Sequence, residues 1–270
     1  LFVYVPICHW IWGNGWLSEK GVMDFAGGIV VHGSAGIAAL VGAIIIGPRK
    51  GFPRTPLMPH NLTMTAMGAG ILWVGWHGFS AGSALMANGS AGMAMLSTHL
   101  CASSASITWI VMDWIKFGKP SVLGAMTGMV AGLGMIAAGA GFVSPFGALL
   151  IGIIAGVACF YSIHLIKQHL LIDDALDVFP VHGVSGILGA LLTGVFADEW
   201  FGGIGIVSEE GIYNQLLIQL FGIAVTIVWS GFISYLLFKL IDKFIGIRVS
   251  QEAETGGLDI NQHDQQGYNF

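Results

Sequence analysis

Charged residues are scarce in this sequence. Asp, Glu, Lys and Arg make up 9% of its 270 residues, whereas hydrophobic residues make up 55%, and the mean hydropathy is +0.79. A soluble domain carries about 25% charged residues, so this composition excludes a water-soluble globular protein and predicts an integral membrane protein. The 41 glycines suit a bundle in lipid, where small side chains let helix backbones approach closely.

Cysteine is also rare, and it occurs without pattern. Cys8, Cys101 and Cys159 lie singly inside apolar runs, so neither a disulfide framework nor a zinc site is indicated. The sequence begins at Leu1 without a methionine, a signal peptide or a basic leader. We therefore expect it to be the C-terminal part of a longer protein.

The sequence consists largely of long apolar runs. A membrane-spanning helix needs roughly 20 mostly apolar residues. After a partial helix that ends near Trp12, the sequence predicts seven full spans, at about residues 24–46, 62–84, 90–115, 121–139, 145–168, 177–197 and 212–241. The predicted fold is an all-α, polytopic transmembrane bundle covering residues 1–248, followed by a polar tail at residues 249–270.

The basic residues predict the orientation of this bundle. Nine of the ten Lys and Arg residues fall in alternate loops or in the tail, and only Lys20 falls on the other side. Because short cytoplasmic loops carry an excess of Lys and Arg, we expect these loops and the C-terminal tail to be cytoplasmic.

One motif occurs twice. Asp24 is followed eight residues later by His32 in D-FAGGIVV-H-GSAGI, and Asp174 by His182 in D-ALDVFPV-H-GVSGI. Under the predicted topology the two helices cross in opposite directions, which makes an inverted repeat. At 1.5 Å per residue each ring lies roughly 12 Å below its own surface, so in a hydrocarbon core of about 30 Å the rings can meet near the midplane.

Such a pair of buried histidines predicts a transport site. Transporters commonly place their sites at the interface of inverted repeats, and an ionisable residue inside a membrane needs a partner or a watery path. Two imidazoles without acidic neighbours can share a proton, whereas a metal site would need a third ligand. The alternative is that each ring is neutral and only packs against a neighbouring helix.

Several motifs together resemble the ammonium transporter family, the Amt/Mep/Rhesus group. They agree in order and spacing along essentially the whole sequence: DFAGGIVVHGSAGIAALVGA, GWHGFSAGS, KPSVLGAMTGMVAGL, DVFPVHGVSGILGALLTGVFA, TIVWSG and GGLDINQHDQQGYNF. The resemblance implies two inverted five-helix halves plus a long final helix, eleven spans in all, assembled as a homotrimer with one pore per subunit. It implies a transporter of ammonium, and often of methylammonium, with no enzyme activity and no cofactor.

On this resemblance the sequence starts within the fourth helix. We expect the region upstream to encode three further spans and one of two gate phenylalanines. The resemblance also implies that Trp12, Phe79 and Ser83 form an external recruitment site, where aromatic faces attract a cation. Trp76 is expected to pack in the pore wall.

The resemblance gives the repeated motif a role as well. His32 and His182 match the paired pore histidines, which would let nitrogen cross as ammonia while a proton moves separately. Asp24 matches a buried organiser at a helix N-terminus, and Asp174 is its inverted counterpart. Asp177 is expected to be an ordinary helix cap.

Other polar residues fall outside these roles. We expect His77 to face a neighbouring helix, His99 to pack or hydrogen-bond within its own helix, and His164 and His169 to lie at a solvated helix end. Pro180 is expected to kink the start of the helix that carries His182.

The tail resembles the regulatory C-terminus of the family, which contacts neighbours in the trimer and docks PII-type signalling proteins. Its acidic residues are Glu252, Glu254, Asp259 and Asp264. The expected location is the plasma membrane or the bacterial inner membrane. The alternatives to a transporter are an ammonium sensor, a Rhesus-type gas channel, which Trp12 disfavours, and a metal or proton transporter.

Overall fold

The computed structural model describes residues 1–55 and 57–267, and this part of the chain contains helices and no strands. The α-helices are α1 (Tyr4–Trp12), α2 (Trp16–Glu19), α3 (Ser34–Ile46), α4 (Leu62–Gly82), α5 (Gly89–Phe117), α6 (Val122–Ile136), α7 (Pro145–His164), α8 (Ser185–Phe196), α9 (Ile212–Phe244), α10 (Gln251–Gly256) and α11 (Leu258–His263). Three π-helical segments, η1 (Gly28–Gly33), η2 (Leu165–His169) and η3 (Phe179–Val184), and a 3-10 turn, η4 (Glu199–Phe201), complete them.

Helices form at all seven predicted positions, so the all-α fold is confirmed. Five continuous helices are long and apolar enough to cross a membrane, at Gly28–Ile46, Gly89–Phe117, Pro145–His169, Phe179–Phe196 and Ile212–Phe244. The other two predicted spans, α4 and α6, do not meet this criterion of length and hydropathy, for different reasons. Helix α6 has 15 residues because the chain turns after Ile136, and α4 has 21 residues but Thr, Gly and His dilute its aliphatic side chains. Whether α4 and α6 span the bilayer therefore remains a prediction.

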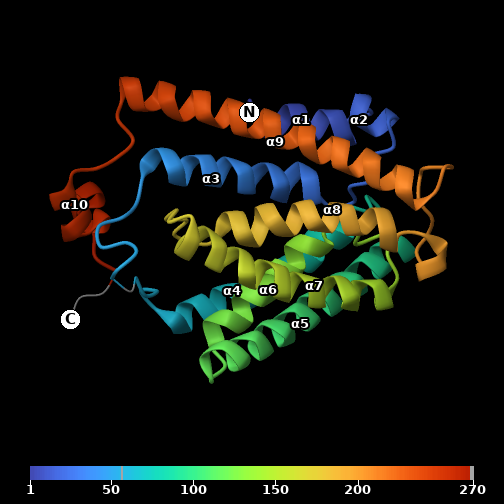
Figure 1. Ribbon diagram of the computed structural model, residues 1–270, viewed down its shortest axis with the longest axis horizontal. Coiled ribbons are helices and arrows are strands. Elements are labelled where there is room, and N and C mark those ends of the chain that lie inside the picture. The colour runs from blue at the N-terminus through green and yellow to red at the C-terminus, as the bar shows by residue number, and fades with distance from the viewer. Residues whose placement is uncertain (56, 268–270) are drawn as a thin grey trace.

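The helices pack in two groups around the repeated motif (Figure 1). Helix α9 runs beside α1 and α3 along one side, and α4 to α7 lie on the other side with α8 between them. Two buried apolar clusters match these groups, one including Ile7, Leu17 and Ile223, the other including Cys101, Ile151 and Phe160. Segment η1 contributes Ile29 and Val30 to the first cluster, η3 contributes Val181 to the second, and the two segments contact each other.

The inverted repeat is visible as a pair of equivalent glycine contacts. A Cβ atom on Gly36 would lie 2.2 Å from the Cα of Gly183, and one on Gly186 would lie 2.8 Å from the amide nitrogen of Gly33. In each case the glycine four residues after one histidine touches the glycine directly after the other histidine. No larger side chain fits at either position, so glycine here sets how closely the two halves approach.

Two buried glutamines of α9 form hydrogen bonds with the backbone of the loop before η1. The backbone N–H of Met23 donates to Gln219 Oε1 at 2.7 Å, and Gln219 Nε2 donates to the carbonyls of Met23 at 2.8 Å and Ala190 at 2.9 Å. Gln215 Nε2 donates to the carbonyl of Gly21 at 3.0 Å. Both glutamine side chains are fully buried, so they replace water for a loop that would otherwise leave buried backbone groups unpaired.

We predict that Gln219→Leu destabilises the protein by about 2 kcal/mol, because it leaves the N–H and C=O of Met23 buried without partners. Thermal unfolding of the purified full-length protein in detergent measures the loss. Gln262→Leu, at an exposed position of α11, is the matched control. Equal stability of the two variants would show that the loop does not depend on Gln219.

Ion pairs connect the loops at the end of the bundle where α3 and α7 end. The guanidinium of Arg49 donates to both oxygens of Asp173, with Nη2 at 2.7 Å from Oδ1 and Nε at 2.8 Å from Oδ2. Arg248 donates to the carbonyls of Ile46 and Pro48, both at 2.7 Å, and pairs with Glu254. The polar tail is thus attached to the loop after α3.

The Arg49–Asp173 pair predicts a pH dependence of stability. Burial alone would raise the pKa of Asp173, but hydrogen bonds and charge from Arg49 outweigh it and lower the pKa below the ordinary 3.8. A carboxylate whose pKa is lower in the folded state stabilises the protein above the unfolded value, and this contribution is lost as the pH falls through the folded value. Asp173→Asn should therefore cost about 1 kcal/mol at pH 7 and progressively less below pH 4.

Thermal unfolding between pH 7 and pH 3 tests this. Glu209→Gln, at an exposed position at the far end of α9, serves as the control and should follow the wild type throughout. A difference between Asp173→Asn and the wild type that stays constant over this range would contradict the ion-pair account.

Candidate functional site

The three residues of the predicted recruitment site line one cavity. Trp12, Phe79 and Ser83 surround a volume of about 410 Å³ near the start of η1, together with Phe25. The indole Nε1 of Trp12 donates to the carbonyl of Asp24 at 2.6 Å, which fixes the ring. The hydroxyl of Ser83 donates to the carbonyl of Phe79 at 3.0 Å, so its oxygen can still accept a hydrogen bond. We refer to this space as the aromatic cavity.

The carboxylate of Asp24 is buried beneath the aromatic cavity and is fully occupied by backbone groups. Its Oδ1 accepts from the N–H of Gly27 at 3.0 Å and of Gly28 at 2.6 Å, and its Oδ2 accepts from Ile29 and Val30, both at 2.9 Å. Four donors on one carboxylate make a strong N-terminal cap for η1. This geometry fits a residue that organises the site without touching a solute.

Asp174 caps η3 as Asp24 caps η1, but it accepts fewer backbone hydrogen bonds. Its Oδ2 accepts from the N–H of Phe179 at 2.7 Å and so caps η3. The expectation for Asp177 was wrong, because its carboxylate pairs with Lys167 Nζ at 2.7 Å and Asp174 supplies the cap instead. Burial raises the pKa of Asp177, and the charge of Lys167 opposes this.

The rings of His32 and His182 meet, as the spacing of the repeat predicted. Their Nδ1 atoms are 3.2 Å apart, and the ring centroids are 5.3 Å apart with an interplanar angle of 17°. His32 is 4% exposed, and its Nε2 has no hydrogen-bond partner among the described residues. Since a neutral imidazole has one N–H and one acceptor, one Nδ1 donates to the other, and both Nε2 atoms can take part in further proton transfer.

A second cavity of about 480 Å³ contains this pair. Trp76 stacks on His32, with centroids 5.1 Å apart and planes at 11°, and Phe79 lines this cavity as well as the aromatic cavity. We refer to this space as the histidine cavity. Sequence reasoning placed Trp76 in the pore wall, but it did not predict the stack on His32 and missed Phe25, because no repeat or spacing marks either residue.

The remaining histidines lie away from both cavities. His77 Nδ1 lies 2.8 Å from the carbonyl of Trp73, and its ring is 5.6 Å from that of His99 on α5. His99 also stacks on Trp73 of α4, so it packs across to another helix. Pro180 lies at the start of η3. Among the described residues, no group of three or more His, Cys, Asp or Glu side chains is placed to hold a metal ion.

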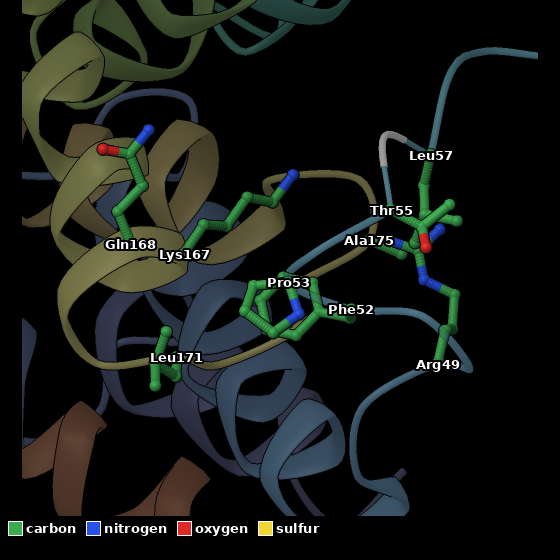
Figure 2. A pocket seen from close by; sticks show the side chains of 9 residues that line it. All are labelled: Arg49, Phe52, Pro53, Thr55, Leu57, Lys167, Gln168, Leu171 and Ala175. Carbon is green, nitrogen blue, oxygen red and sulfur yellow. The ribbon is translucent and has the colours of Figure 1, made fainter.

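A further cavity, of about 440 Å³, lies at the end of the bundle where the ion pairs are. Figure 2 shows Arg49, Phe52 and Pro53 from the loop after α3, with Lys167 and Gln168 from η2 and Leu171 from the loop after it. Two cationic side chains line it, Arg49 and Lys167, and each is paired with a carboxylate, that of Asp173 or of Asp177.

Comparison with known proteins identifies the family. Residues 1–268 match the model of the Ammonium Transporter Family. The chain belongs to the ammonium transporter family. It is 48% identical over 271 residues to a protein of Aquifex aeolicus named ammonium transporter, covering 100% of this chain and 63% of that protein. It is 43% identical over 270 residues to the ammonium transporter Amt1 of Archaeoglobus fulgidus, covering 99% and 68%.

Solved structures of the family share the fold. A structure titled Sensor Amt Protein superposes with a TM-score of 0.90 at 33% identity, covering 96% of this chain and 66% of that one. Mep2 of Saccharomyces cerevisiae superposes with a TM-score of 0.82 at 35% identity, covering 93% and 58%. The two sequence relatives are named ammonium transporters and one solved structure is titled a sensor, which agrees with the prediction that the protein is not an enzyme. The chain spans about 60% to two thirds of their lengths.

We predict that Asp24→Asn destabilises the full-length family member by about 2 kcal/mol, because an amide NH2 would face two backbone N–H donors. Thermal unfolding in detergent gives the cost. The matched control is Asp198→Asn, which alters a carboxylate that caps the exposed turn η4 through a single bond to Trp200. If Asp24→Asn is no more damaging than this control, the four-donor cap does not stabilise η1.

Proposed function

We propose that the full-length protein carries ammonium across a membrane, binding the cation in the aromatic cavity and passing it as ammonia through the histidine cavity. The main observation in support is the contact between His32 and His182, whose Nδ1 atoms are 3.2 Å apart. The cavity that contains them shares Phe79 with the aromatic cavity. The named function of the relatives supports ammonium as the substrate.

The aromatic cavity suits an ammonium ion. The faces of Trp12, Phe25 and Phe79 offer cation–π attraction of about 1 to 2 kcal/mol, and the hydroxyl oxygen of Ser83 can accept a hydrogen bond. No carboxylate lines this part of the structure, since the residues around it are aromatic, small or aliphatic. Binding would therefore be weak and reversible, as a recruitment site requires.

The histidine cavity does not suit a charged ion. It is lined by apolar and aromatic side chains together with the two imidazoles, and removing a full charge from water into such surroundings costs several kcal/mol. Ammonia is neutral and small, so it avoids this cost. We therefore place loss of the proton between the two cavities, near Phe79.

The histidine pair can carry the released proton. A proton taken up at Nε2 of one ring allows the shared proton to move from that Nδ1 to the other Nδ1, and the second ring then releases its own Nε2 proton. The transfer between the rings follows the existing hydrogen bond between the two Nδ1 atoms, and no side chain has to become a lasting buried cation.

Further parts of the proposal concern the complete molecule. We place it as a homotrimer in the plasma membrane or the bacterial inner membrane, with the tail cytoplasmic, where a PII-type regulator could bind. The distribution of basic residues supports the orientation. The attachment of the tail to the loop after α3 through Arg248 and Glu254 supports a regulatory position.

We predict that His32→Ala and His182→Ala each reduce uptake of labelled methylammonium by at least about tenfold, because each removes one half of the proton path. Cells expressing the complete gene provide the measurement. His99→Ala is the matched control, since His99 lines neither cavity, and it should transport at the wild-type rate. Unchanged uptake in both pore variants would contradict the proposed role of His32 and His182.

The alternative is an ammonium sensor, which the likeness to a structure titled Sensor Amt Protein favours. A sensor would bind ammonium in the aromatic cavity but would give no uptake. Measuring ammonium binding to the purified protein beside uptake in cells separates the two. Trp12→Ala should weaken binding under either function and should lower uptake only in a transporter.

A further inference from the structure

A second pair of histidines lies outside both cavities, where α4 packs against α5. The ring centroids of His77 and His99 are 5.6 Å apart, and their planes are tilted by 34°. His32 and His182 are joined by a hydrogen bond between their Nδ1 atoms, whereas no hydrogen bond joins His77 to His99 in the described part of the chain. We refer to His77 and His99 as the α4–α5 histidine pair.

The hydrogen bond of His77 leaves its other ring nitrogen as an acceptor. Nδ1 lies 2.8 Å from the carbonyl oxygen of Trp73, and because a carbonyl can only accept, Nδ1 carries the proton. A neutral imidazole has one N–H and one bare nitrogen, so Nε2 keeps its lone pair. Histidines that bind metal ions usually donate their other N–H to a carbonyl or carboxylate in this way.

Trp73 positions the second ring as well. Its indole stacks on His99, with centroids 5.2 Å apart and planes at 20°. His99 is exposed, so its ring can be reached from outside the bundle. One residue of α4 therefore contacts both imidazoles, one through its carbonyl and the other through its side chain. Rings that are held in place before a ligand arrives lose little freedom when it binds.

The separation of the rings fits two imidazoles that share one metal ion. Metal–nitrogen bonds of about 2.1 Å that meet at roughly 110 to 120° place the two ring centroids about 5.2 to 5.5 Å apart. The observed separation of 5.6 Å leaves room for an ion between His77 and His99. The rings of His32 and His182 leave no such room, because their Nδ1 atoms are in direct contact.

The helices around the α4–α5 histidine pair carry no other charge. From Leu62 to Met112 the sequence has no Asp, Glu, Lys or Arg, and α6, which packs against both helices, has none either. No cation on these helices therefore repels a bound ion. His77 lies five residues before the end of α4, about 7 to 8 Å along the helix. An ionisable side chain inside a membrane needs a partner or a watery path, and a bound ion would serve both rings.

We propose that His77 and His99 bind a divalent transition-metal ion, with water in its remaining coordination positions. Imidazole nitrogens favour Cu²⁺, Ni²⁺ and Zn²⁺, of which Cu²⁺ binds most tightly, whereas Mg²⁺ and Ca²⁺ prefer oxygen ligands. Among the described residues, no third His, Cys, Asp or Glu completes the site. The ion therefore exchanges readily, unlike a structural zinc ion with four protein ligands.

The test titrates the purified full-length protein, without a histidine tag, in detergent with Cu²⁺, Zn²⁺ and Mg²⁺. Calorimetry gives the affinities, and electron paramagnetic resonance counts the imidazole nitrogens bound to Cu²⁺. The wild type should bind Cu²⁺ through two nitrogens, Zn²⁺ more weakly and Mg²⁺ not at all. His77→Ala and His99→Ala should each weaken Cu²⁺ binding at least about tenfold, because a ligand already held in place is lost. The matched control is His9→Ala, which removes an exposed histidine of α1 and should bind Cu²⁺ as the wild type does.

Two further variants remove a ligand but preserve the packing. His99→Phe keeps a ring on Trp73, and His77→Gln keeps a donor for the Trp73 carbonyl. Their unfolding temperatures in metal-free buffer should match the wild type, and both should lose tight Cu²⁺ binding. Equal Cu²⁺ affinity in the wild type and His77→Ala would overturn the proposal. So would a loss in His99→Ala alone, which indicates an ion shared between copies of the chain, or an equal loss in His9→Ala, which indicates unspecific binding by surface histidines.

Discussion

The hydrogen bond between His32 and His182 depends on how closely two backbones can approach. Packed helices usually lie 8 to 10 Å apart, yet here the backbone of Gly36 touches that of Gly183, and Gly186 reaches the backbone of η1. Glycine at these positions allows both imidazoles to lie between the halves with their Nδ1 atoms 3.2 Å apart. A methyl group at either contact would separate the halves and break this hydrogen bond.

The π-helical turns bring the two rings to this crossing point. Each histidine lies in a π-helical segment, η1 or η3, where the wider turn shifts the register of side chains and often marks a functional site. Each turn is completed by a serine whose hydroxyl donates to a backbone carbonyl, Ser34 to Val30 at 2.6 Å and Ser185 to Val181. The cap from Asp24 fixes the other end of η1, so the position of His32 is determined from both sides.

Much of this arrangement could be predicted from the sequence because the motif repeats. The spacing of eight residues from Asp to His, combined with opposite topology, predicted that the rings meet, and they do. The apolar runs predicted the helices. The π-helical turns were not predicted, since hydrophobic periodicity carries no sign of a single wider turn. The stack of Trp76 on His32 depends on where α4 packs, which is a tertiary property. The pairing of Asp177 with Lys167 is missed for the same reason, because the two residues approach only after η2 has formed.

The separation of the two cavities gives the proposed path its selectivity. Phe79 lines both, so its ring stands between a space that attracts a cation and a space that does not. The carboxylate of Asp24, whose carbonyl binds Trp12, already accepts four backbone hydrogen bonds and cannot compensate a charge beyond Phe79. Potassium ions could enter the aromatic cavity by the same cation–π attraction, but they have no proton to give up. On the proposed path, only a cation that becomes neutral by losing a proton would continue to the histidines, and this requirement, more than the width of the path, would distinguish ammonium from potassium.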